Sequence, residues 1–166
     1  MIMPHRTLKV PERGMLDAYA QTLAARGYSA DPAQRAAAER LQRLYTELLS
    51  FKVARRSTFR RLLTRTDPPR GVYFWGGVGR GKSFLMDCFY DSVPYKRKKR
   101  IHFHAFMQQV HRQLDALKDQ ADPMDTLAAN IARDVRLLCF DEFHVSDIAD
   151  AMILGRLLKA LFARGV

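Results

Sequence analysis

The sequence predicts an α/β fold in which a parallel sheet is flanked by helices and preceded by an N-terminal helical segment. Three observations predict it: helical periodicity dominates residues 1–66, a Pro-Pro break follows at residues 67–71, and short apolar runs then alternate with helix-compatible stretches up to residue 166. We therefore expect a helical segment over residues 1–70 and a sheet-containing domain over residues 71–166.

Two helices are predicted in the N-terminal segment. The first covers residues 14–26 and ends at a glycine, which is typical of a helix C-terminus. The second begins with Asp31 as N-cap and Pro32 at its first position, while Gln34, three residues after the cap, completes a capping box. Its apolar face consists of Leu41, Leu44, Tyr45, Leu48 and Leu49. Helical structure is expected to continue through Phe59 and Leu62.

Strands and helices alternate in the second part. Strands are expected at residues 72–75, 101–103 and 135–140, and helices at residues 83–91, 124–132 and 148–162. A further helix after residue 103 has an apolar face made of Phe106, Val110, Leu114 and Leu117. The basic residues 96–100 resemble a nucleic-acid or localisation patch, but a solvated loop leading into a strand explains them as well.

A glycine-rich motif lies between the first expected strand and the next helix. It fits the phosphate-loop pattern GxxxxGK[ST], in which glycines let successive N–H groups converge on a phosphate at a helix N-terminus. Lys82 supplies a charge for the β and γ phosphates, and the Ser83 hydroxyl is a ligand for Mg²⁺. The motif therefore predicts ATP and Mg²⁺ binding. The expected nucleotide-binding positions are Gly76, Gly77, Val78, Gly79, Arg80, Gly81, Lys82, Ser83 and Phe84.

Two carboxylates end the apolar run that begins at Val135. Ligands of open α/β sheets bind at strand ends, so Asp141 is expected to hold Mg²⁺, through water, and Glu142 to polarise the attacking water. The pair lies 59 positions after Lys82, and both motifs are expected to meet around one metal-bound triphosphate. Lys82 and Glu142 are the predicted catalytic residues. A small-molecule kinase is disfavoured, because a kinase must avoid activating water.

Net charge is concentrated in the first part. The whole chain carries +11, of which residues 1–70 contribute +8 (14 Lys and Arg against 6 Asp and Glu) and residues 71–166 contribute +3 (14 against 11). Such an excess of positive charge could bind nucleic acid, an anionic membrane or an acidic protein. A solvated, arginine-rich helical surface with no such partner explains it equally well. Neither a membrane-spanning run nor a signal-peptide stretch is recognisable, so a cytoplasmic location is the default expectation.

Histidines and cysteines offer a second possible site. His102 and His104 would share one face of a strand and His111 would lie on the next helix, but no nearby ligand completes a zinc set, so partly buried structural histidines are the preferred interpretation. His144 is expected to be an exposed loop residue, with a place at the rim of the site as the alternative. Cys88 and Cys139 lack any CxxC spacing and are expected in the core.

Four segments together resemble the ZapE-type AAA+ ATPases, which are bacterial cell-division proteins with mitochondrial relatives. The segments are residues 27–34, residues 71–90 around the phosphate loop, His-Phe-His-Ala-Phe-Met at 102–107, and residues 138–154, which contain the Asp141–Glu142 pair. The resemblance implies an AAA+ P-loop fold and ATP hydrolysis coupled to remodelling of a protein partner. It also implies FtsZ as that partner, at the inner face of the cell membrane at the division site. The resemblance is also compatible with assembly into a homo-oligomer and with peripheral association with the membrane. Nucleic acid is the less favoured partner.

The family pattern continues past Val166. The resemblance implies that a sensor strand, an arginine finger and a helical lid would follow, with the sensor strand between the phosphate-loop strand and the Asp141 strand. A chain ending at Val166 is therefore expected to hydrolyse ATP weakly, because an arginine finger contributes roughly 10³–10⁵ in rate in related NTPases. The alternative function is an AAA+ protein of the helicase-loader type, which the basic first part would favour.

Overall fold

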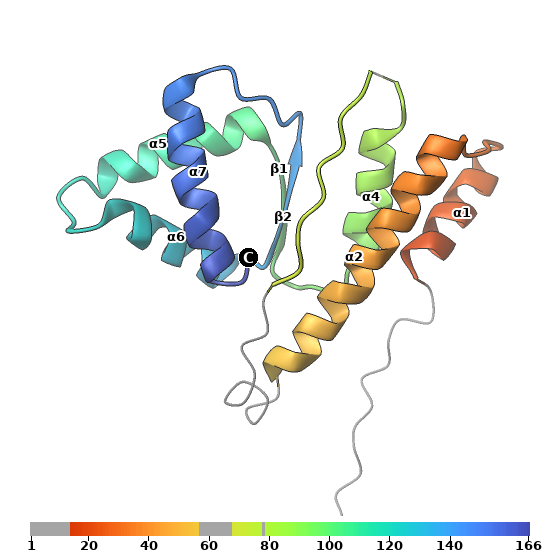
Figure 1. Ribbon diagram of the computed structural model, residues 1–166, viewed down its shortest axis with the longest axis horizontal. Coiled ribbons are helices and arrows are strands. Elements are labelled where there is room, and N and C mark those ends of the chain that lie inside the picture. The colour runs from red at the N-terminus through yellow and green to blue at the C-terminus, as the bar shows by residue number, and fades with distance from the viewer. Residues whose placement is uncertain (1–13, 57–67, 78) are drawn as a thin grey trace, which may run out of the picture. The chain divides into compact units, whose positions relative to one another are not determined.

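The computed structural model describes residues 14–56, 68–77 and 79–166, whose helices and strands are labelled in Figure 1. The chain forms two compact units: Met1–Glu47 with Gly71–Pro94, and Leu48–Arg70 with Tyr95–Val166. The expected helical continuation through Phe59 and Leu62 lies outside the described residues, and the domain boundary at residue 70 stays a prediction.

The described part of the first unit contains helices and the phosphate loop. Helix α1 covers Met15–Ala25, α2 covers Pro32–Arg56 and enters the second unit after Glu47, and α4 covers Lys82–Ser92. Helix α1 ends as predicted, because Gly27 has φ 66° and the Tyr28 N–H donates to Leu23 O (3.0 Å). Gln42 Oε1 accepts from the Leu16 N–H (3.1 Å) and so joins α2 to α1.

The start of α2 confirms the predicted capping box. The Gln34 N–H donates to Asp31 Oδ1 (2.8 Å), and the Asp31 N–H donates to Gln34 Oε1 (3.1 Å). Each side chain thus satisfies a backbone donor that the first helical turn leaves without a partner. The apolar face of α2 is also confirmed, except that Leu49 is only half-buried; its buried members are Leu41, Leu44, Tyr45 and Leu48.

A two-stranded parallel sheet organises the second unit. Strand β1 covers Lys98–His102 and β2 covers Leu137–Asp141, and their register pairs Arg100 with Cys139 and His102 with Asp141. Helices α5 (Phe103–Ala116), α6 (Pro123–Asp134) and α7 (Ile148–Ala163) pack together on one side of this sheet (Figure 1). The α/β class with a parallel sheet is confirmed, and it matches part of a P-loop NTPase fold.

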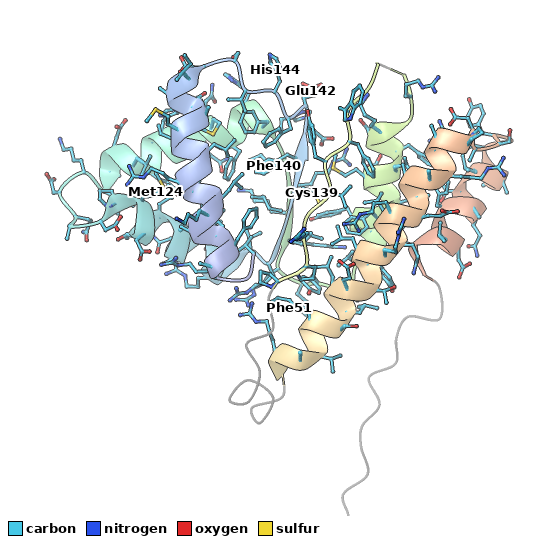
Figure 2. The ribbon with its side chains drawn as sticks, viewed as in Figure 1. Phe51, Met124, Cys139, Phe140, Glu142 and His144 are labelled. Atoms are coloured by element: carbon cyan, nitrogen blue, oxygen red, sulfur yellow. The ribbon has the colours of Figure 1, made fainter. Side chains whose placement is uncertain are left out.

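The core of the second unit lies between these three helices and one face of the sheet. Its fully buried members include Leu127 of α6 and Leu157 of α7. Phe140 of β2 packs on this core with its ring 4.8 Å from that of Phe106, and Figure 2 shows it beside the helices. Cys139, next along the strand, points to the opposite face because side chains alternate in a strand. Both Cys139 and Cys88 are buried free thiols, as predicted.

One strand prediction is wrong, and a second strand exists with different bounds. Residues 72–75 form no strand, and among the described residues the only ladder is the one between β1 and β2. An apolar run becomes a strand only when a neighbouring strand accepts and donates its backbone hydrogen bonds. The other expected strand, residues 101–103, begins three residues earlier, so that Lys98 and Arg100 belong to β1 and not to a loop. Basic residues fit there because their stems pack while their charges reach partners or solvent.

None of the described helices combines the length and apolar character needed to cross a membrane.

Candidate nucleotide-binding site

The phosphate loop adopts a backbone that glycine alone takes up easily. Gly76, Gly79 and Gly81 have φ values of 143°, 77° and 75°, and apart from their chain neighbours no described residue has an atom within 4 Å of a Cβ placed at Gly76 or Gly79. Left-handed backbone next to helical backbone makes successive N–H groups converge into an anion-binding concavity. The described loop residues thus have the glycine-dependent backbone that the phosphate-loop pattern predicts, and phosphate binding there stays a prediction; Val78 lies outside the described residues.

Helix α4 begins at the last loop residue. Gly81 is its N-cap, and the Leu85 N–H donates to Gly81 O (3.0 Å), so the first intrahelical bond starts there. The N–H groups of Lys82, Ser83 and Phe84 therefore have no carbonyl partner within the helix. Together with the helix dipole, they favour a negatively charged group at this end of α4.

Lys82 folds its ammonium group back over the loop. Lys82 Nζ donates to Gly76 O (2.7 Å) and to Gly77 O (2.6 Å). Phosphate oxygens are charged acceptors and bind an ammonium more strongly than these neutral carbonyls do. A nucleotide phosphate can accordingly exchange with the two carbonyls as the partner of Lys82.

The N-terminal helices contact the loop and the first turn of α4. Gln34 Nε2 donates to Arg80 O (3.3 Å), and Asp31 Oδ2 lies 3.5 Å from Arg80 Nη2. The Phe84 ring lies 5.7 Å from that of Tyr19 and 4.8 Å from the Arg26 guanidinium carbon. No sequence pattern predicted these contacts. The capping-box pattern located Asp31 and Gln34, but nothing in the sequence pointed from them to the loop.

Asp141 is the last residue of β2, as the sequence predicts, and Arg100 of β1 holds it. Arg100 Nε lies 2.6 Å from Asp141 Oδ2, and Nη2 lies 3.1 Å from Oδ1, which makes a bidentate ion pair. The hydrogen bond with Asp141 raises the pKa of Arg100. The sequence placed Arg100 only in the basic run 96–100, and no pattern linked it to Asp141; the parallel register, in which Arg100 neighbours Cys139 two positions from Asp141, brings the pair together.

Glu142 lies just beyond the strand, where the chain turns sharply. Its φ of 52° is left-handed, a conformation that costs a non-glycine residue on the order of 1–3 kcal/mol and that recurs at active sites. Its side chain is 85% exposed, with Oε2 4.0 Å from His102 Nδ1. Figure 2 labels Glu142 and His144 in the segment between β2 and α7. His144 is exposed, as predicted.

The other histidines correct one expectation. His104 lies on α5 and not on a strand with His102, because the chain turns into the helix at Phe103, which is buried against Phe140 and Phe143. All three histidines are exposed, not partly buried; His104 contacts Gln108, and His111 Nε2 lies 2.7 Å from Asp150 Oδ1. Within the described parts of the chain, no group of three or more His, Cys, Asp or Glu side chains could hold a metal ion.

The structure thus gathers the predicted site residues into two groups. The described loop residues, Lys82, Ser83 and Phe84 belong to the first unit, and Asp141 and Glu142 belong to the second. Their meeting around one metal-bound triphosphate stays a prediction. Taken one by one, the Ser83 hydroxyl and the Asp141 carboxylate are hard oxygen donors of the kind that Mg²⁺ prefers, although Arg100 engages both Asp141 oxygens in this structure.

Comparisons with known proteins agree with these features. The chain is 46% identical to the Escherichia coli cell division protein ZapE over 159 residues, which is 89% of this chain and 42% of that protein. It is 46% identical to the zebrafish lactation elevated protein 1 homolog B over 114 residues, covering 62% of this chain and 23% of that protein. An uncharacterised protein of Schizosaccharomyces pombe is 40% identical over 170 residues, covering 82% of this chain and 37% of that protein.

The chain therefore spans less than half the length of these curated relatives. No solved structure matches it significantly. The AFG1-like ATPase family model matches residues 14–166, which is nearly the whole chain, and the protein belongs to the AFG1-like ATPase family.

Proposed function

We propose that this chain is the nucleotide-binding part of a Mg²⁺-dependent ATPase whose hydrolysis cycle drives remodelling of a protein partner. Lys82 and the loop N–H groups bind the triphosphate, and Ser83 and Asp141 hold the metal ion. When bound, Mg²⁺ neutralises charge on the phosphate oxygens as the terminal phosphoryl group is transferred. Glu142 orients the attacking water and accepts its proton.

The conformation of the phosphate loop carries this proposal. Three glycines have positive φ, α4 begins directly after them, and the Lys82 ammonium lies over the loop carbonyls. A glycine-rich turn without a binding role would have no reason to combine these three features. The loop N–H groups, the helix N-terminus and the Lys82 ammonium all supply positive charge to one short segment of the chain. Membership of the AFG1-like ATPase family supports the same conclusion.

A division protein is the proposed partner. The E. coli relative is named as a cell division protein, and the ZapE-type resemblance adds FtsZ and the inner face of the cell membrane as the specific partner and place. The second candidate is a nucleic-acid-handling ATPase, which the +8 charge of residues 1–70 favours. Cosedimentation with FtsZ polymers that requires ATP supports the first candidate. DNA binding with a steep salt dependence supports the second instead.

Binding of a fluorescent ATP analogue tests the nucleotide site directly. Lys82→Ala should abolish measurable binding, because it removes the positive charge nearest the phosphates. Lys118→Ala, an exposed lysine in the turn after α5, is the matched control and should bind like the wild-type chain. Glu142→Gln should keep binding and lose turnover, since the amide cannot accept a proton. Equal affinity of the Lys82→Ala and wild-type chains would refute the proposal.

A further inference from the structure

The amino-terminal end of α2 is attached to the phosphate loop at one point. Gln34 Nε2 donates to Arg80 O (3.3 Å), and a Cβ at Gly81 would lie only 3.1 Å from the same nitrogen. Asp31, the N-cap of α2, lies within 3.5 Å of the Arg80 guanidinium. A hydrogen bond and an ion pair therefore join this helix end to Arg80, and the space beside Gly81 is too narrow there for a Cβ unless Gln34 shifts.

Gln34 uses both ends of its carboxamide at this junction. Oε1 accepts from the Asp31 N–H (3.1 Å), and Nε2 donates to Arg80 O (3.3 Å). The Asp31 N–H can only donate and the Arg80 carbonyl can only accept, so the two contacts fix which way the amide group faces. The helix cap and the loop are consequently bridged by one half-buried side chain.

The Arg80 carbonyl controls a donor that a phosphate needs. In a trans peptide, the carbonyl of one residue and the N–H of the next point in opposite directions. Holding Arg80 O toward Gln34 therefore directs the Gly81 N–H away from Gln34. The direction matters because the N–H groups of a phosphate loop bind phosphate only when they converge.

We propose that Gln34 is a positioning residue for the phosphate loop: by holding the Arg80 carbonyl, it presets the Gly81 N–H for a nucleotide phosphate. The inference rests on the proposed function of this loop as an ATP site. It assigns to the N-terminal helix a role in nucleotide binding, in addition to any role in binding partners.

Two substitutions separate this role from helix capping. Gln34→Glu keeps the acceptor for the Asp31 N–H, and Glu is the usual residue at this position of a capping box. Helix α2 should therefore be as stable in this variant as in the wild-type chain. The carboxylate cannot donate to Arg80 O. Gln34→Met also loses the donor and adds no charge, but it loses the acceptor for the Asp31 N–H as well, so its weaker binding supports the positioning role only together with the same loss in Gln34→Glu. Both variants should bind a fluorescent ATP analogue about five-fold more weakly, the change expected for one ordinary hydrogen bond.

Gln42→Glu provides the matched control. Gln42 lies on the same helix in the same unit, and its Oε1 accepts from the Leu16 N–H of α1 instead of facing the loop. This variant introduces the same charge and should keep wild-type affinity. Hydrogen exchange at saturating analogue gives an independent measurement, in which the bound analogue should protect the Gly81 amide less in both Gln34 variants than in the wild-type chain and in Gln42→Glu.

The outcomes distinguish the inference from the function on which it rests. If the wild-type chain binds the analogue and Lys82→Ala does not, the nucleotide site stands. Wild-type affinity in Gln34→Met would then overturn the positioning role, and so would equal losses in Gln34→Glu and Gln42→Glu. If Lys82→Ala binds as tightly as the wild-type chain, the proposed function itself fails, whatever the Gln34 variants do.

Discussion

The ion pair between Arg100 and Asp141 should contribute measurably to stability before any nucleotide binds. Arg100 Nε and Nη2 contact the two oxygens of Asp141 at 2.6 and 3.1 Å. The Asp141 side chain is 12% exposed and that of Arg100 is 29% exposed, so water screens the pair only in part. We therefore choose Arg100→Met, which keeps most of the apolar stem of the side chain and removes its charge.

The expected loss lies between two known limits. Breaking a buried pair by removing one partner costs about 3–5 kcal/mol, because a buried charge loses its compensation. Exposed pairs contribute about 0–1 kcal/mol. Since Asp141 is nearly buried and the contact is bidentate, we expect Arg100→Met to lower the free energy of unfolding by about 2–3 kcal/mol.

Urea denaturation of four nucleotide-free proteins measures the pair itself. Wild type, Arg100→Met, Asp141→Ala and the double variant form a cycle that subtracts whatever else either side chain contacts. Arg133→Met is the matched control, because Arg133 and Asp134 form a 3.5 Å pair in which both side chains are 70% exposed, and it should cost less than about 1 kcal/mol. If the losses from Arg100→Met and Asp141→Ala add to within about 0.5 kcal/mol, the two residues are not coupled and the reasoning is refuted.

Three further predictions concern a thiol, the core and the loop. Burial raises the pKa of the Cys139 thiol from 9.0 to about 11, so the stability that the protonated thiol provides should be complete below pH 9 and lost as the pH rises through 11. Urea denaturation of the wild-type chain at several alkaline pH values measures this loss of stability. Cys139→Val, which has no thiol at this position, is the reference and should lack this part of the pH dependence. Leu157→Ala should cost about 2–5 kcal/mol in urea denaturation because Leu157 is fully buried, whereas half-buried Leu158→Ala should cost less; equal losses would contradict the core assignment. Gly81→Ala should weaken binding of an ATP analogue, because φ is 75° and left-handed backbone costs a residue with a Cβ about 1–2 kcal/mol. Gly155→Ala on α7, with open space around its Cβ, should leave binding unchanged.

The sequence by itself determined the local features of this protein, meaning those that depend on residues close together along the chain. The capping box at Asp31 and Gln34, the glycine that ends α1 and the GxxxxGK[ST] pattern all act over a few neighbouring residues, so their consequences are visible in the sequence. Helical periodicity likewise located the apolar face of α2. The pattern around Lys82 likewise predicted the helix that begins at Lys82 and the glycines with positive φ before it, whereas phosphate binding there stays a prediction.

Contacts between distant segments were decided by tertiary structure. Residues 72–75 are as apolar as a strand, yet a strand also needs a hydrogen-bonding neighbour, which no local pattern supplies. Arg100 looked like part of a solvated loop until the parallel register placed it two positions from Asp141. Gln34 meets Arg80 across 46 residues of chain. Periodicity and spacing describe neighbours along the chain, whereas these pairings depend on how the elements pack.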